Sequence, residues 1–255
     1  MRIFKFYKTS VGKKVVVAIT GFILFAFLVL HMLGNLNIYS GAEKIDAYSL
    51  YLRQFAEGFF GFGGFLWIVR VVLLSAFILH IWTIVLLVKQ NYRGRPIRYK
   101  RKKRFAATLA GITMLATGPI ILIYLVLHIL QFTTGTIQPT PYRVTDAGIG
   151  SAYWNLWMAF QVWWIAWGYI AVMAMVCLHL KHGLWSMFQS VGLNNPDRNR
   201  SAHVFAYVGA FAIFIGFASV PLLVWTGVVP PPPQHTNAID AALPSIAPTL
   251  SVEEK

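Results

Sequence analysis

Five long apolar segments, separated by shorter polar ones, set the pattern of the chain. They cover residues 15–38, 63–88, 105–132, 160–180 with an extension to 188, and 204–225. About 20 mainly apolar residues are enough to cross the hydrocarbon core of a bilayer. Because every backbone polar group must be hydrogen-bonded inside lipid, each segment is predicted to be a transmembrane helix. The expected fold class is all-α, a five-transmembrane-helix bundle.

The two ends of the chain are predicted to differ. The first apolar segment follows Lys13 and Lys14, but it is too long for a secretion signal and has no small-x-small cleavage site, which predicts a retained span. After Gly227 the chain continues with four prolines at residues 230–233 and then with small and polar residues. We therefore expect one transmembrane domain over residues 1–227 and an extended or disordered tail over residues 228–255.

Composition agrees with a lipid-facing surface, since 57% of the residues are hydrophobic and 12% are charged. The net charge of +14 would fit a nucleic-acid partner if the basic residues were clustered on one domain. Instead, 17 of the 22 Lys and Arg residues lie at the N-terminus, after the second span or after the fourth span, all on one side of the predicted bundle. This distribution predicts a cytoplasmic N-terminus and no nucleic-acid binding.

The sequence excludes several cofactor sites that this chain would have to form by itself. Its single cysteine, Cys177, cannot supply an intrachain disulfide or the four ligands of an iron–sulfur cluster. The dinucleotide fingerprint GxGxxG and the phosphate loop GxxxxGK[ST] do not occur. If electrons pass through this protein, another subunit has to bring the flavin or the clusters.

Four of the seven histidines lie inside the predicted spans, one on each of the first four: His31, His80, His128 and His179. Ionisable residues inside a membrane are costly and are usually functional. Successive helices alternate in direction, so a rise of about 1.5 Å per residue sorts the histidines into two depths. His31 and His128 are expected in the outer half, and His80 and His179 near the inner side. Each pair joins helices that run parallel.

Two histidine pairs predict two b-type haems. A haem iron accepts axial imidazoles from both faces, and filling both positions favours electron transfer over chemistry at the iron. Zinc is the competing metal, but pairs about 16 Å apart cannot form one tetrahedral site, and no carboxylate or second cysteine lies nearby. The remaining histidines are expected to be ordinary solvated side chains: His182, His203 and His235.

Two further features agree with this arrangement. The dipeptide Thr20-Gly21 precedes His31 by the same spacing as Thr117-Gly118 precedes His128, which places both dipeptides at the depth of the inner haem. Small residues there would admit a porphyrin edge, or would simply pack helices. Arg70 lies near the depth of the outer pair, and we expect it to bind a propionate of the outer haem. Snorkelling of its side chain to the surface is the alternative.

The neighbours of these residues resemble a known family. The stretches that carry the resemblance are SVGKKVVVAITGFILFAFLVLHMLGNL, IVRVVLLSAFILHIW, LATGPIILIYLVLHILQF and LHLKHGLWSMF. They are similar to the single-chain, two-haem cytochrome b subunit of succinate dehydrogenases and fumarate reductases. The resemblance covers all five spans, about residues 8–226, and the four histidine contexts occur in the family's order.

The resemblance implies a membrane anchor in the bacterial cytoplasmic membrane, with a flavoprotein subunit and an iron–sulfur subunit on its cytoplasmic face. Electrons would pass between succinate or fumarate and a membrane quinone, usually menaquinone. The chain would not oxidise succinate itself but would contribute the quinone site. The family's ligand pairs, one on the distal haem and one on the proximal haem, correspond to His31 with His128 and to His80 with His179.

One position departs from the family's fumarate reductases, which carry a glutamate two residues before the fourth ligand. That position is Cys177, which favours a succinate:quinone reductase. The depth of the quinone site stays open. Its candidate polar groups are Glu57, Tyr39 and Arg53 near the outer haem, or Lys13, Trp185 and His182 near the inner haem.

Two other functions stay open. The haem subunit of a hydrogenase or formate dehydrogenase would use a different partner, but the spacing around each ligand and the single histidine per helix argue against it. A transporter or channel would use the histidines as a proton or metal relay. Its usual signature is a set of inverted repeats with broken helices. Here only Pro119 and Pro221 interrupt the spans.

Overall fold

The computed structural model describes residues 2–94, 109–145, 147–193 and 195–233, and the regular secondary structure of these residues is helical. The five long helices are α2 (Ser10–Asn35), α5 (Gly64–Arg93), α6 (Leu109–His128), α8 (Trp163–Ser190) and α9 (Pro196–Trp225). A short π-helical turn, η2 (Ile129–Thr133), continues α6. The predicted all-α fold is confirmed for the described residues, and all five helices are long and apolar enough to cross a membrane.

The observed helix ends differ from the predicted ones for local reasons. α2 begins before residue 15, because the Thr9 side chain accepts a hydrogen bond from Gly12 N and caps the helix. The fourth span begins at Trp163, because the preceding residues form a separate helix, α7 (Ala152–Phe160). The predicted extension of this span to residue 188 is confirmed. Residues 105–108, the basic residues of 95–104, and the tail beyond residue 233 with His235 lie outside the described residues.

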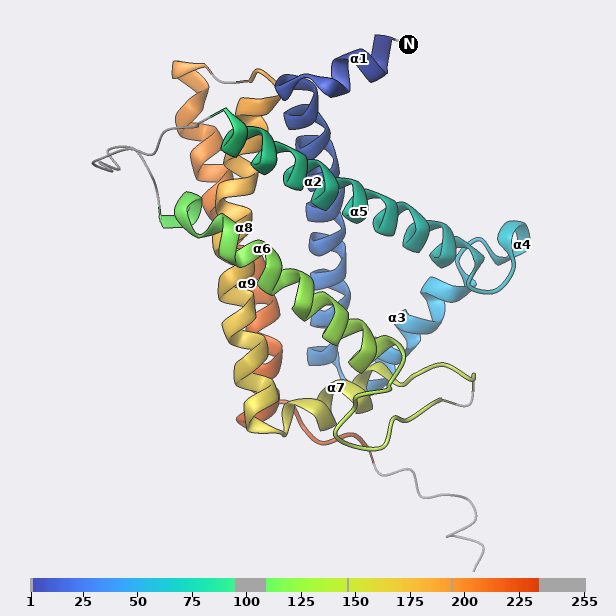
Figure 1. Ribbon diagram of the computed structural model, residues 1–255. Coiled ribbons are helices and arrows are strands. Elements are labelled where there is room, and N and C mark those ends of the chain that lie inside the picture. The colour runs from blue at the N-terminus through green and yellow to red at the C-terminus, as the bar shows by residue number, and fades with distance from the viewer. Residues whose placement is uncertain (1, 95–108, 146, 194, 234–255) are drawn as a thin grey trace, which may run out of the picture.

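The middle of the bundle is formed by α2 and α8, which pack against each other. α5 packs on α2, α6 packs on α8, and α9 packs on both α2 and α8. Figure 1 shows α2, α8 and α9 side by side along the bundle, whereas α5 and α6 slant across it. The arrangement therefore consists of two helix pairs, α2 with α5 and α6 with α8, which are joined through the contact between α2 and α8.

Short helices lie at the end of the bundle at which α2 finishes: η1, a 3₁₀-helix (Leu36–Ser40), α3 (Ala42–Gln54) and α7. A further short helix, α4 (Glu57–Phe60), packs on the start of α5 (Figure 1). The Asp46 carboxylate on α3 accepts hydrogen bonds from Ala152 N at 2.6 Å, Tyr153 N at 3.2 Å and the Ser151 hydroxyl at 2.8 Å. Because these donors belong to the first turn of α7, the carboxylate caps that helix and ties α3 to it.

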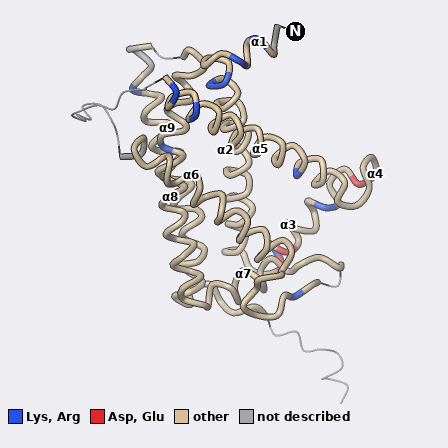
Figure 2. The backbone as a smooth tube through the Cα atoms, in the orientation of Figure 1, with Lys and Arg blue, Asp and Glu red and all other residues tan. Residues whose placement is uncertain are grey.

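Charge is distributed unequally between the two ends of the bundle (Figure 2). The end at which α1 (Arg2–Lys8) joins α2 carries Lys5, Lys8, Lys13, Lys14, Lys89 and Arg93. Glu43, Asp46 and Glu57 lie away from this basic end. Between the two ends, apolar side chains such as Val71, Leu74 and Ile78 on α5 are exposed, as a lipid-facing surface requires. The predicted orientation relies on this asymmetry and stays a prediction.

Candidate functional site

The structure brings His31 and His128 together from helices that are far apart in the sequence. His31 is on α2, and His128 is the last residue of α6 before the π-helical turn. Their ring centroids are 6.0 Å apart, with the ring planes at 83°. Two imidazoles that bind one metal ion from opposite sides, each at a metal–nitrogen distance of about 2 Å, have ring centres roughly 6 Å apart. The spacing of this outer pair therefore suits two axial ligands of one metal ion.

Aromatic side chains surround the outer pair. Phe27 stacks on the His31 ring at 5.3 Å and an interplanar angle of 13°, and Phe217 lies 5.7 Å from the same ring. Around His128 the ring centroids of Tyr124, Phe132 and Tyr169 lie at 5.6, 5.5 and 6.1 Å. A site walled by flat apolar rings suits a planar macrocycle and keeps water from the ligands.

The Tyr169 hydroxyl orients the ring of His128. It donates to Gln131 Oε1 at 2.9 Å, and it lies 3.5 Å from His128 Nδ1. Because its hydrogen is directed to Gln131, the contact with His128 needs a hydrogen on Nδ1. A neutral imidazole protonated at Nδ1 has its lone pair on Nε2, which is then free to bind a metal ion.

The inner histidines are each held by a threonine of the neighbouring helix. His80 Nδ1 on α5 lies 3.0 Å from the Thr20 hydroxyl on α2. His179 Nδ1 on α8 lies 3.3 Å from the Thr117 hydroxyl on α6. Both threonines are buried, with 4% and 1% of their surface exposed. These contacts join the two helices of each pair at the level of the inner histidines.

Each of these threonines also donates to its own helix. Thr20 Oγ1 donates to the Val16 carbonyl at 2.8 Å, and Thr117 Oγ1 donates to the Met114 carbonyl at 3.4 Å. With the hydroxyl hydrogen used in this way, the oxygen is left to accept from the histidine. Both inner imidazoles are then protonated at Nδ1 and carry a free Nε2 lone pair.

The glycine that follows each threonine lies against the same imidazole. A Cβ added to Gly21 would be 3.3 Å from His80 Cε1, and one added to Gly118 would be 4.0 Å from His179 Cε1. The sequence predicts small residues at the inner level. In the structure each of these glycines packs against the histidine of the adjacent helix.

The structure also brings the two inner histidines into the same region of the bundle. His179 is close enough to His80 and His182 for electrostatic interaction between their rings. Thr20 lies eleven residues before His31 on the same helix, so the inner level is about 16 Å from the outer level. Among the described residues, no three His, Cys, Asp or Glu side chains come together as a metal site. Sites with two imidazoles each fit the axial positions of haem and do not fit tetrahedral zinc.

Arg70 lies at the surface of the described structure, near a second arginine. Its side chain is exposed on α5, with Cζ 4.9 Å from the Trp67 ring centroid. It also lies near enough to Arg53 on α3 for the two charges to interact. Burial lowers the pKa of Arg53, and the positive charge of Arg70 lowers it further. The proximity of these two arginines was not foreseen from the sequence, and the role of Arg70 as a propionate ligand stays a prediction.

The candidate quinone residues do not gather in one place. Tyr39 donates to Ser219 Oγ at 2.7 Å, and Arg53 donates to Ser49 on its own helix. At the other end, Lys13 donates to Gln90 Oε1 at 3.0 Å, and Trp185 stacks on His203 with ring centroids 3.5 Å apart. His182 is beside His179, and Glu57 is exposed at the start of α4. No choice between the two depths follows from these contacts.

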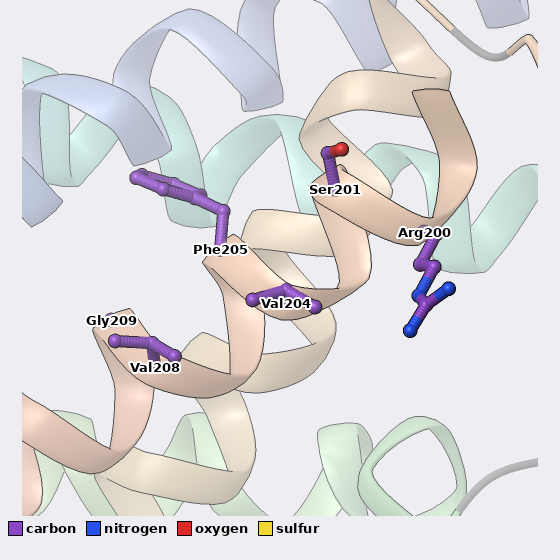
Figure 3. A pocket seen from close by; sticks show the side chains of 6 residues that line it. All are labelled: Arg200, Ser201, Val204, Phe205, Val208 and Gly209. Atoms are coloured by element: carbon purple, nitrogen blue, oxygen red, sulfur yellow. The ribbon is translucent and has the colours of Figure 1, made fainter. Parts of the chain in front are cut away.

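A shallow apolar groove runs along α9 (Figure 3), and none of the four histidines lines it. The lining residues are Arg200, Ser201, Val204, Phe205, Val208 and Gly209. All six belong to one helix, and none is a candidate ligand. The groove therefore adds nothing to the histidine site.

Comparisons with known proteins give no relative from which a role could be transferred. No protein family, no curated protein and no solved structure matches the chain.

Proposed function

We propose that this chain is the two-haem cytochrome b membrane subunit of a succinate:quinone oxidoreductase. The observation that carries the proposal is the meeting of His31 and His128, from α2 and α6, at a ring separation of 6.0 Å. The inner histidines, His80 on α5 and His179 on α8, supply a second pair. Four histidines on four helices at two levels form a path along the bundle.

The chain's own residues would hold and shield two b-type haems. His31 with His128, and His80 with His179, would be the axial ligands, through Nε2 in the three histidines whose Nδ1 lies beside a hydroxyl oxygen. The aromatic rings around the outer pair exclude water and leave a low-dielectric site. Haem bound at both levels would supply two one-electron carriers, with no open position for oxygen or substrate.

The identity of the partners is supported by the resemblance in sequence alone. It favours a flavoprotein subunit and an iron–sulfur subunit on the basic end of the bundle, with menaquinone or another quinone as the membrane substrate. Cys177 is half-buried on α8, and it stands where the resembling fumarate reductases have glutamate. Its thiol cannot replace a carboxylate in proton transfer at neutral pH, which favours succinate oxidation.

Spectroscopy of the purified chain tests the haem content. We expect two b-type haems per polypeptide and a change in the spectrum on reduction. His31→Ala should remove the outer haem and keep the inner one, because the inner ligands are about 16 Å away and have their own threonine contacts. His203→Ala is the matched control, since this exposed histidine stacks on Trp185 and should leave both haems. Loss of both haems, or of neither, in His31→Ala would show the pairing to be wrong.

The choice of partner needs a separate test. Membranes that contain the chain should show haem reduction on addition of succinate, and purification through a tag on the chain should recover a flavoprotein and an iron–sulfur protein. Reduction by hydrogen or formate, with none by succinate, would assign the chain to another quinone-linked dehydrogenase.

A further inference from the structure

The two threonine–histidine contacts at the inner level share one pattern, although His80 also has the Val17 carbonyl as a hydrogen-bond partner. In each case the threonine lies eleven residues before an outer histidine, is followed by glycine, and meets Nδ1 of the inner histidine on the packed neighbouring helix. Both hydroxyls also donate to a backbone carbonyl one turn earlier. The outer level has a different contact, in which a tyrosine lies 3.5 Å from His128.

A hydrogen bond from Nδ1–H changes the imidazole as a ligand. When Nδ1–H donates to an acceptor, electron density rises on Nε2 and the ring becomes a more basic ligand. A more basic ligand stabilises the oxidised metal ion more than the reduced one, which lowers the reduction potential. At 3.0 and 3.3 Å, two such bonds act together on one inner site.

We propose that Thr20 and Thr117 are positioning residues that hold the inner histidines in one tautomer and lower the reduction potential of the inner haem. This inference relies on the proposed function, because it needs haem at the inner level. It goes further by assigning a redox role to two hydroxyls that do not touch the metal ion. The inner site then has two Nδ1–H acceptors, at 3.0 and 3.3 Å, whereas the outer site has one such contact, at 3.5 Å.

Potentiometric titration of purified variants tests the inference. Thr20→Val and Thr117→Val keep the branched shape and remove the acceptor, and Thr20→Ser and Thr117→Ser keep the acceptor. We expect each valine variant to raise the midpoint potential of the inner haem. The shift should be of the order of tenfold in the reduction equilibrium, about 59 mV for one electron. The serine variants should stay near the unaltered chain, and the outer haem should be unchanged in all four. The His31→Ala variant should keep only the inner haem, so its titration shows which of the two reduction steps belongs to that haem.

Each other outcome has a defined meaning. If a valine variant loses the inner haem and the matched serine variant keeps it, the hydroxyl is needed to hold the ligand, and the proposal is supported. If both variants lose it, or if both haems are present and the potentials do not move, the threonines only pack helices and the inference is overturned. Absence of haem from the unaltered chain would overturn the proposed function and this inference with it.

Discussion

At the scale of single residues, one glycine on each of two helices sets the room beside an inner histidine. A Cβ on Gly21 would come within 3.3 Å of His80 Cε1, which is tighter than ordinary van der Waals contact. A Cβ on Gly118 would lie 4.0 Å from His179 Cε1, which is an ordinary contact. His80 is also fixed by its bond to Thr20, so the ring has little freedom to move away.

Alanine substitution should therefore separate the two glycines. Alanine is favoured over glycine in a helix interior by about 0.5–1 kcal/mol. Gly118→Ala should keep or raise the midpoint of thermal unfolding and leave the inner haem in place. Gly21→Ala should lose that gain and lower the haem content or shift the haem spectrum, because His80 has to give way by a few tenths of an ångström. Thermal unfolding and haem content of the two purified variants check this, and equal behaviour would contradict it.

The sequence predicts the depth of these residues but not their partners. An interval of eleven residues on one helix places Thr20 at the inner level whatever the fold. Its bond to His80 depends on how α5 slants across α2, which is a tertiary property. The outer pair was easier to foresee, because two histidines at one depth in a small bundle have few other partners.

At the scale of elements, the spans are predictable and the faces of the helices are not. A run of about 20 apolar residues has to be a helix in lipid, so the five spans follow from hydropathy alone. A helix that is apolar all round gives no periodicity to show which side is buried. α5 is such a helix, so the sequence does not show which face of α5 carries Arg70; in the structure its side chain is exposed beside Trp67.

The short helices at the outer end are stabilised by specific polar contacts, and Asp46 offers the clearest test. Asp46→Ala should remove three hydrogen bonds to the first turn of α7 and lower the thermal unfolding midpoint, at a cost of about 1–2 kcal/mol for a lost helix cap. Glu43→Ala is the matched control, because it removes an exposed carboxylate from α3, the helix that also carries Asp46. Equal midpoints for the two purified variants would show that the Asp46 contacts do not stabilise the outer end.

At the scale of the whole molecule, the candidate site consists of two similar halves. α2 carries an outer histidine and a threonine that holds the inner histidine of α5, and α6 carries the same set for α8. In each half the second helix follows the first in the chain and packs on it. Each histidine pair takes one member from each half, so neither half can form a two-ligand site alone. α9 lies outside this repeat and packs on the central helices α2 and α8.

This arrangement gives the path a direction only if the basic end of the bundle faces the cytoplasm. Single cysteines test that orientation in a Cys177→Ser background, since Cys177 is the only native cysteine. Lys8 is exposed at the basic end, and Ala147 is exposed in the loop before α7 at the opposite end. In spheroplasts, an impermeant maleimide should label Ala147→Cys at once and Lys8→Cys only after permeabilisation, because positively charged segments stay on the cytoplasmic side. The reverse pattern would place the basic end outside and would remove the cytoplasmic docking face that the proposed partners need.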